Sequence, residues 1–99
     1  MYNCHLMEKK KLKIVRNKLD KLDLKLLSLV KKRTLLVNQV IEIKKYKKHI
    51  VDRVRIKEIL KKIRKNSIKK KIDPQITNRI WKSMIGSYIE YETKNFKKK

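Results

Sequence analysis

Apolar residues in the first half of the chain recur at spacings that alternate between three and four. The series consists of Leu12, Val15, Leu19, Leu22, Leu26, Leu29, Leu36, Val40 and Ile43. Such a series is a heptad seam along one side of a helix, and it predicts a helix from about Glu8 to about Tyr46. The helix is long because no glycine or proline interrupts the chain before residue 74.

Arg33 occupies the one position of this seam that is not aliphatic. A charge on a buried stripe needs a partner of opposite sign, because an unpaired buried ion is strongly destabilising. Either another side chain or a ligand anion can supply that partner. We favour a ligand anion, and the alternative is an interhelical salt bridge between Arg33 and Asp23 or Glu92.

The length of this helix predicts a homodimer. At ~1.5 Å rise per residue, a helix of about 39 residues is roughly 58 Å long. A compact domain of about 100 residues has a radius of gyration of only ~13 Å. The rest of the chain is too short to cover so long an apolar seam. We therefore predict an intertwined homodimer, in which the seam packs against that of a second copy.

The second half of the chain predicts two shorter helices. Residues 47–51 form a connection, and Asp52 is a good N-cap for a helix that fades near Asn66. Asp73 followed by Pro74 supplies an N-cap with proline at the first helical position, and this third helix continues to about Lys94. Apolar residues line one side of each helix, namely Ile56, Ile59, Leu60 and Ile63 on the second and Ile76, Ile80, Trp81, Met84, Ile85, Tyr88 and Ile89 on the third. Glu92 continues the stripe of the third helix.

These elements make the chain an all-α protein of three helices. One glycine and one proline in 99 residues exclude most β and α/β architectures, which need turn residues at every corner. We assign residues 1–7 to an N-terminal extension, residues 8–94 to one helical domain and residues 95–99 to a basic tail.

The net charge of +22 favours a polyanionic partner. However, lysine outnumbers arginine 25 to 6, and lysines fall on every outward face of the predicted helices. We therefore interpret most of the charge as a solvated surface and expect no specific nucleic-acid partner. A basic helical nucleic-acid-binding protein stays a distant alternative.

The remaining composition predicts a cytoplasmic protein without metal or cofactor. The single cysteine, Cys4, cannot form an intramolecular disulfide and suits a reducing compartment. The sequence contains neither a signal-peptide pattern nor an apolar run of the roughly 18 residues that a membrane span requires. His5 and His49 have no partners at metal-ligand spacing. We expect no membrane association.

The cations that carry chemistry are selected by their direction. Arg33 and Lys44 are 11 residues apart, so at ~100° per residue they project the same way from one helix. Arg16 points elsewhere, and in a dimer it can reach the partner's site. Arg55 lies in the first turn of the second helix. Together with the acidic Glu92, these residues predict a pocket for a small dianion, because arginine binds carboxylates in bidentate fashion.

Simpler interpretations of the same residues stay open. Lys44 is one of many lysines, and Glu92 can be a solvated side chain near a helix end. Tyr88 and Trp81 fit a helix core as well as they fit a ligand contact.

The pattern resembles the all-helical chorismate mutases, a family that also contains the isochorismate pyruvate lyases. The resemblance extends over roughly residues 12 to 93. In the first helix it rests on Arg16 followed by hydrophobic residues and an aspartate within residues 14–23, on the hydrophobic run 26–30 that leads to Arg33, and on Lys44. In the second half of the chain it rests on the Asp-x-x-Arg segment 52–55 and on residues 72–74 followed by Ile80 and Trp81.

The resemblance implies an intertwined homodimer with two equivalent shared sites. Each site takes Arg16 from one subunit and Arg33, Lys44, Arg55 and Glu92 from the other. The implied reaction is the rearrangement of chorismate to prephenate, an isomerase step of the shikimate pathway toward phenylalanine and tyrosine. Such a pericyclic reaction needs neither nucleophile nor cofactor. Arg16 and Arg33 hold the substrate carboxylates with support from Arg55, and Lys44 donates to the breaking ether oxygen.

Two positions depart from the usual family pattern. Many members carry glutamine where Glu92 falls, and glutamate can donate a hydrogen bond there only when it is protonated. Ile56, which follows the segment from Asp52 to Arg55, replaces a glutamate that touches the substrate hydroxyl in many mutases. The lyase branch is also apolar at Ile56 and has a tyrosine where Tyr88 falls. Cleavage of isochorismate to pyruvate and salicylate is therefore the alternative activity.

Overall fold

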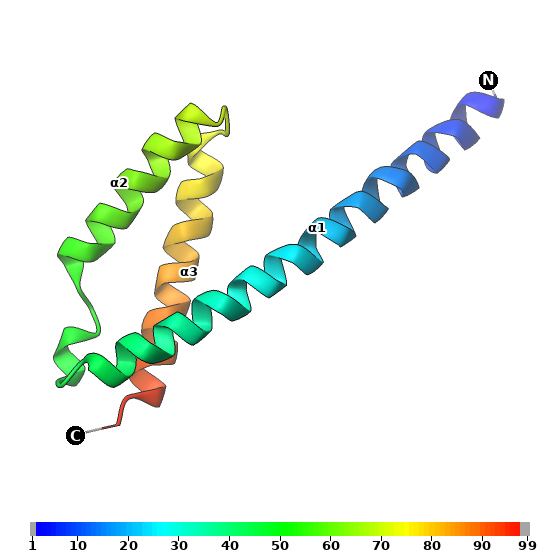
Figure 1. The fold of residues 1–99 in the computed structure, drawn as a ribbon. Coiled ribbons are helices and arrows are strands. Elements are labelled where there is room, and N and C mark those ends of the chain that lie inside the picture. The colour runs from blue at the N-terminus through cyan, green and yellow to red at the C-terminus, as the bar shows by residue number, and fades with distance from the viewer. Residues whose placement is uncertain (1, 98–99) are drawn as a thin grey trace. The chain divides into compact units, whose positions relative to one another are not determined.

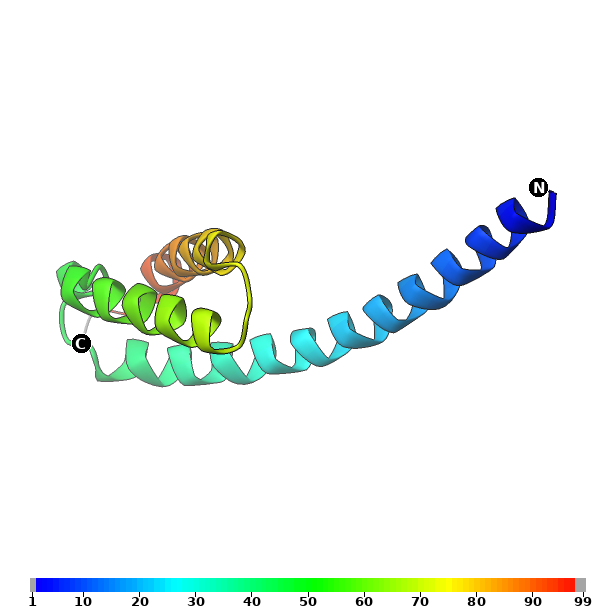
Figure 2. The same cartoon turned by 90° about the horizontal axis from the view of Figure 1, so that it is seen from above.

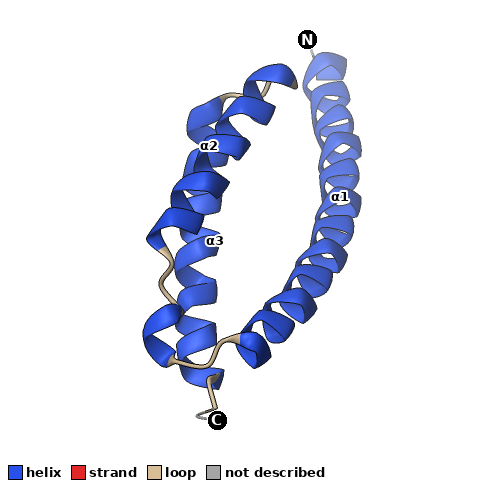
Figure 3. Cartoon of the chain, turned by 60° about the vertical axis from the view of Figure 1, so that its left-hand side comes forward, coloured by secondary structure: helices blue, strands red, loops and turns tan. Residues whose placement is uncertain are grey.

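The computed structural model describes the backbone of residues 2–97 and the side chains of residues 6–97. It contains three helices, α1 (Tyr2–Ile43), α2 (Arg53–Lys69) and α3 (Pro74–Asn95), and one short 3-10 turn, η1 (Lys47–His49), between the first two (Figure 1). Within the described range all regular structure is helical, as the colouring of Figure 3 makes plain. The predicted all-α class and the long first helix are confirmed.

The two ends of α1 differ from the prediction. The helix begins at Tyr2 rather than near Glu8, because residues 2–7 contain no helix breaker. It ends at Ile43 rather than near Tyr46, where the backbone is already extended with φ −127° and ψ 137°. The last backbone bond of this helical ladder runs from the Lys44 N–H to the Val40 carbonyl, at 3.0 Å. The division into extension, domain and tail stays a prediction.

The chain divides into two units, residues 1–36 and residues 37–99, which we describe separately. In the first unit, the seam of α1 is uncovered. Its members Leu12, Val15, Leu19, Leu22, Leu26 and Leu29 are 47–57% exposed. A single chain thus leaves this row of aliphatic side chains in water.

In the second unit, α2 and α3 lie side by side as an antiparallel pair (Figures 1 and 2). Both predicted N-caps are confirmed. The Asp52 carboxylate accepts the Arg55 N–H at 3.0 Å, and the Asp73 carboxylate accepts the Gln75 N–H at 2.9 Å. These bonds satisfy backbone donors that the first turn of a helix leaves without partners.

A buried hydroxyl pair joins α2 to α3 near the turn between them. Ser67 Oγ and Thr77 Oγ1 are 2.8 Å apart. Ser67 Oγ also lies 2.6 Å from the Ile63 carbonyl and Thr77 Oγ1 lies 3.3 Å from the Pro74 carbonyl, so either hydroxyl can donate to the other. The turn itself passes through Lys71, whose φ of 58° is left-handed. The turn is thereby fixed by polar contacts, and the buried aliphatic residues Val37, Ile41 and Ile50 form a small core of this unit.

Candidate active site

Lys44 and Glu92 form an ion pair within the second unit. Lys44 follows the last turn of α1, Glu92 lies on α3, and Nζ and Oε2 are 3.6 Å apart. Both side chains are largely buried, with 20% and 12% of their surface exposed. Lys44 Nζ also donates to the Ile50 carbonyl at 3.2 Å. Because Ile50 is buried beside η1, its carbonyl holds the ammonium group in a fixed place.

Glu92 keeps one oxygen without a hydrogen bond. Oε2 is buried and has no hydrogen-bond partner among the described residues. Its 3.6 Å separation from Lys44 Nζ is longer than a hydrogen bond between charged groups. A buried polar atom that lacks a partner is costly and uncommon, and it often marks a functional site. The oxygen can therefore accept or donate a hydrogen bond that the described residues do not supply.

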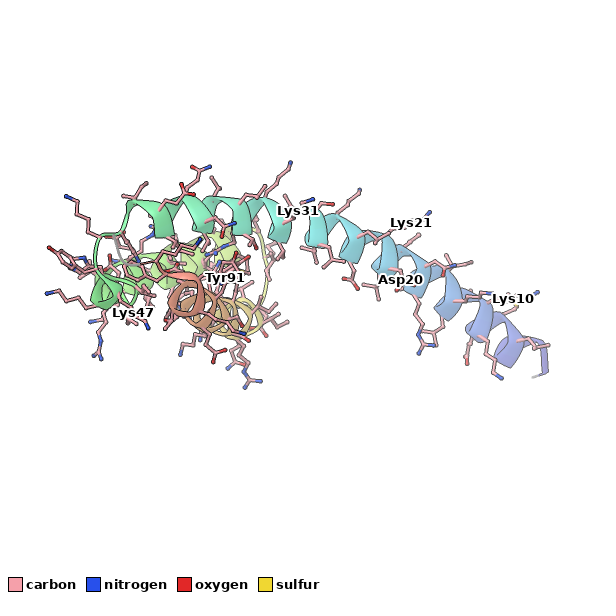
Figure 4. The ribbon with its side chains drawn as sticks, turned by 90° about the horizontal axis from the view of Figure 1, so that it is seen from below. Lys10, Asp20, Lys21, Lys31, Lys47 and Tyr91 are labelled. Atoms are coloured by element: carbon pink, nitrogen blue, oxygen red, sulfur yellow. The ribbon has the colours of Figure 1, made fainter. Side chains whose placement is uncertain are left out.

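A second polar contact joins the end of α1 to α3. Tyr91 Oη donates to Asn38 Oδ1 at 2.7 Å, and the Tyr91 ring meets that of Tyr88 edge-on at 6.3 Å. Figure 4 shows Tyr91 on α3, beside the last turns of α1. A shallow cleft adjoins this contact, lined by Asn38, Ile41, Glu42, Tyr91, Asn95 and Lys97. The contact fixes the rotation of α3, on which Glu92 is the next residue.

Sequence reasoning did not find the contact between Tyr91 and Asn38. Its two residues are 53 positions apart, and neither breaks the local hydrophobic pattern. The only available signal was the position of Tyr91 directly before Glu92.

The predicted site residues on α2 have separate contacts. The Arg55 guanidinium pairs with Glu58 at 3.5 Å, where both side chains are more than half exposed. The Asp52 carboxylate is engaged as the N-cap of α2. Ile56 and Tyr88 are half-buried. The roles of these residues toward a ligand stay predictions.

The two predicted arginines of α1 belong to the first unit. Arg16 is exposed, and Arg33 is partly buried. The expected role of Arg33 beside Lys44 of the same chain, and that of Arg16 from a second chain, both stay predictions. Of the predicted site residues, Lys44 and Glu92 are a pair that the structure brings together. Glu92 is thus a partner of Lys44, whereas the sequence suggested Arg33 as its alternative partner.

Lys44 and Glu92 can donate hydrogen bonds to a bound molecule and stabilise charge on it electrostatically. The part of the chain that the structure describes contains no cluster of three or more histidine, cysteine, aspartate or glutamate side chains that could hold a metal ion. No helix within that same part is long and apolar enough to cross a membrane. An ammonium group beside a carboxyl oxygen can stabilise negative charge that develops on a bound molecule.

Comparison with known proteins adds one finding. The model of the family described as chorismate mutase type II matches residues 15–93. No curated protein and no solved structure matches the chain significantly. The matched range contains the second unit up to Thr93, and with it Lys44 and Glu92. It also contains Arg16 and Arg33.

Proposed function

The chain belongs to the chorismate mutase type II family, and we propose that it catalyses the rearrangement of chorismate to prephenate. The observation that carries this proposal is the buried Glu92 oxygen without a hydrogen bond, 3.6 Å from Lys44 Nζ and inside the matched range. The family match supports a mutase-like enzyme, and the pair supplies the chemistry that the reaction needs. The product would enter the synthesis of phenylalanine and tyrosine.

The rearrangement breaks an ether bond while a carbon–carbon bond forms, so no nucleophile takes part. Catalysis requires that the flexible dianion be held in its compact reactive shape and that charge on the ether oxygen be stabilised. Lys44 donates to that oxygen from a position fixed by the Ile50 carbonyl. Glu92 in its protonated form donates a second hydrogen bond. The ligand thereby satisfies the buried carboxyl group.

The two substrate carboxylates are bound by arginines. Arg33 of one subunit holds one carboxylate, and Arg16 of the other subunit holds the second. Arginine suits this task because its planar fork matches a carboxylate in bidentate fashion. Arg55 gives up its exposed contact with Glu58 and supports this binding, since an exposed ion pair contributes little stability.

Asp52, Ile56 and Tyr88 complete the lining of the proposed pocket. Asp52 holds the start of α2, which carries both Arg55 and Ile56. Tyr88 lies one helical turn before Glu92 on α3.

The proposed site needs a homodimer. The aliphatic seam of α1 is about half exposed in the single chain, although such a row is normally buried against a partner helix. A second copy presents the same seam and brings Arg16 to the site of its partner. We therefore propose an intertwined homodimer with two shared active sites.

A second candidate activity is the cleavage of isochorismate to pyruvate and salicylate. It is favoured by Ile56, which offers no group for the substrate hydroxyl, and by the half-buried Tyr88. Both residues match the lyase branch of the resemblance. The same cations would bind isochorismate, because it carries the same two carboxylates.

Incubation of the full chain with each substrate tests these proposals. The mutase proposal expects loss of chorismate absorbance and formation of prephenate. If salicylate forms from isochorismate and no prephenate forms from chorismate, the lyase activity would replace the mutase activity as the proposed function. The matched control is a pair of neighbouring substitutions, Lys44→Gln at the buried ammonium and Lys45→Gln at an exposed one. Only Lys44→Gln should abolish turnover, and equal activity of the two variants would contradict the proposed role of Lys44.

A further inference from the structure

The positive charge is distributed unevenly among the helices. Residues 53–71, which comprise α2 and the turn after it, contain ten lysines and arginines and a single acid, Glu58. The 22 residues of α3 contain three lysines and arginines and two acids. A general excess of lysine in the composition would raise the positive charge of both helices alike. The concentration of charge on α2 therefore requires a local explanation.

Four of these cations share the side of α2 that faces away from α3. At ~100° per residue, Lys57, Lys61, Arg64 and Lys65 fall within an arc of roughly 100°, and all four are exposed. The opposite side of α2 carries the less exposed residues Ile59, Leu60, Ile63 and Ser67, of which Ser67 contacts Thr77 of α3. The two helices lie side by side (Figure 2). We call the four exposed cations the basic face of α2.

Among the described residues, no acid forms an ion pair with the basic face. Within the described part of the chain, no carboxylate lies at ion-pair distance from any of its four residues. Glu58, the acid on α2, is paired with Arg55 at 3.5 Å. Arg55 lies outside the arc of the basic face. The basic face is therefore a separate positive surface that the proposed reaction does not use.

The composition of the basic face selects among polyanionic partners. A protein interface of useful affinity contains aromatic or aliphatic anchors at its centre. Two exposed apolar residues fall within the arc of the basic face, Val54 and Ile68, but they lie near opposite ends of α2, and only the four cations lie between them in the arc. A membrane-surface helix inserts its apolar side into lipid, whereas the apolar side of α2 is occupied by α3. Phosphate groups of nucleic acid need neither, because exposed lysines and arginines bind them without reading bases.

We propose that the basic face of α2 binds the phosphate backbone of nucleic acid without sequence specificity. The four cations follow one another along one side of α2, so they can contact successive phosphates of one strand. The lysines at positions 69, 70 and 71 extend this positive surface into the turn. The proposal is independent of the proposed reaction, because no catalytic or substrate-binding residue belongs to the basic face.

The test compares two variants of the full chain with equal charge. K57Q/K61Q/R64Q/K65Q removes the basic face, and K9Q/K10Q/K11Q/K13Q removes four exposed lysines of α1. Each lowers the net charge by four, from +22 to +18. Binding to a labelled DNA duplex of mixed sequence is followed by fluorescence anisotropy between roughly 50 and 200 mM salt, the range over which counterion release changes affinity steeply.

The basic-face variant should lose affinity by on the order of tenfold or more, and its salt slope should fall by about 0.9 for each lost phosphate contact. The α1 variant should keep nearly the slope and affinity of the wild type. A further variant, K57R/K61R/K65R, should retain binding, because it keeps every charge on α2. Circular dichroism checks that the helices persist, and turnover of chorismate should be unchanged in all three variants.

Three results would overturn the proposal. The first is equal loss of DNA binding in the two charge-matched variants, which would mean that total charge alone attracts the duplex. The second is failure of K57R/K61R/K65R to bind. The third is basic-face-dependent binding to phosphatidylserine vesicles without such binding to DNA, which would identify a lipid surface as the partner. Failure of the mutase assay has no bearing on any of these results.

Discussion

The two units of the chain differ in how far a single copy satisfies its own side chains. Residues 37–99 bury a small core, join α2 to α3 through Ser67 and Thr77, and place Lys44 beside Glu92. Residues 1–36 are one stretch of helix whose aliphatic seam stays half exposed. Most residues of the proposed site therefore belong to one chain, whereas Arg16 has to come from a second copy.

Among the arginines, the largest expected effect comes from Arg33, the charge in the seam. Arg33→Ala should lower turnover of chorismate by at least about 100-fold, because it removes a charge-assisted contact to a substrate carboxylate. The helical content should persist, since alanine favours helix. Steady-state kinetics and circular dichroism measure the two results. Lys32→Ala, at the exposed neighbouring position, is the control. Similar turnover of the two variants would mean that Arg33 does not bind substrate.

A charge placed in the seam should break the dimer. Leu26→Lys puts an ammonium group where the proposed interface buries a leucine, and desolvation of that group strongly opposes association. Sedimentation should show monomers in a range where the wild type is dimeric, and turnover should fall with them because Arg16 no longer reaches its partner. The control is Ser28→Lys, which adds the same charge on nearly the opposite side of α1. Dissociation by Ser28→Lys as well would argue against the seam as the interface.

The proposed role of Glu92 predicts that turnover depends on pH. If protonated Glu92 donates to the ether oxygen, turnover should decline as pH rises, because the carboxylate form has no proton to donate. Glu92→Gln carries a donor at every pH, so its profile should be flatter and its activity at alkaline pH higher than that of the wild type. Rate measurements between acid and alkaline pH test both statements. Identical profiles for the two proteins would show that Glu92 is not the donor.

The sequence predicted those parts of the molecule that follow from local pattern. The heptad seam indicated the length of α1, and the N-caps Asp52 and Asp73 marked the starts of α2 and α3. Lys44 and Glu92 were identified by direction and by an acid on an apolar stripe. Their contact with each other was not predicted, because it depends on how α3 packs against the end of α1.

Contacts between distant residues escaped the sequence patterns altogether. The carbonyl that holds Lys44 belongs to Ile50, and it reaches Nζ only because the chain turns back through η1. Tyr91 and Asn38 meet across 53 positions by tertiary packing. The early start of α1 at Tyr2 was missed since no capping residue marks it. Periodicity and caps identify elements, whereas the site arises from the packing between them.

The smallest expected effect concerns the folding stability of the second unit, residues 37–99. Lys71 has a left-handed backbone, which costs a residue with a Cβ about 1–2 kcal/mol. Glycine avoids this cost, but part of the gain is lost because glycine has more conformational freedom in the unfolded chain. Lys71→Gly should therefore stabilise the fold by about 0.5–1 kcal/mol and raise Tm by roughly 2–6 °C. Lys70→Gly removes the same charge where φ is −88°, so it should leave Tm unchanged or lower it. Thermal unfolding followed by circular dichroism compares the two variants.

A rise in Tm for both would point to relief of charge repulsion in the turn, and no rise for Lys71→Gly would mean that the strain is absent. Because the turn lies outside the seam, neither variant should change the sedimentation of the proposed dimer, so the stability of the hairpin can be tuned without altering the proposed contribution of Arg16 from a second copy.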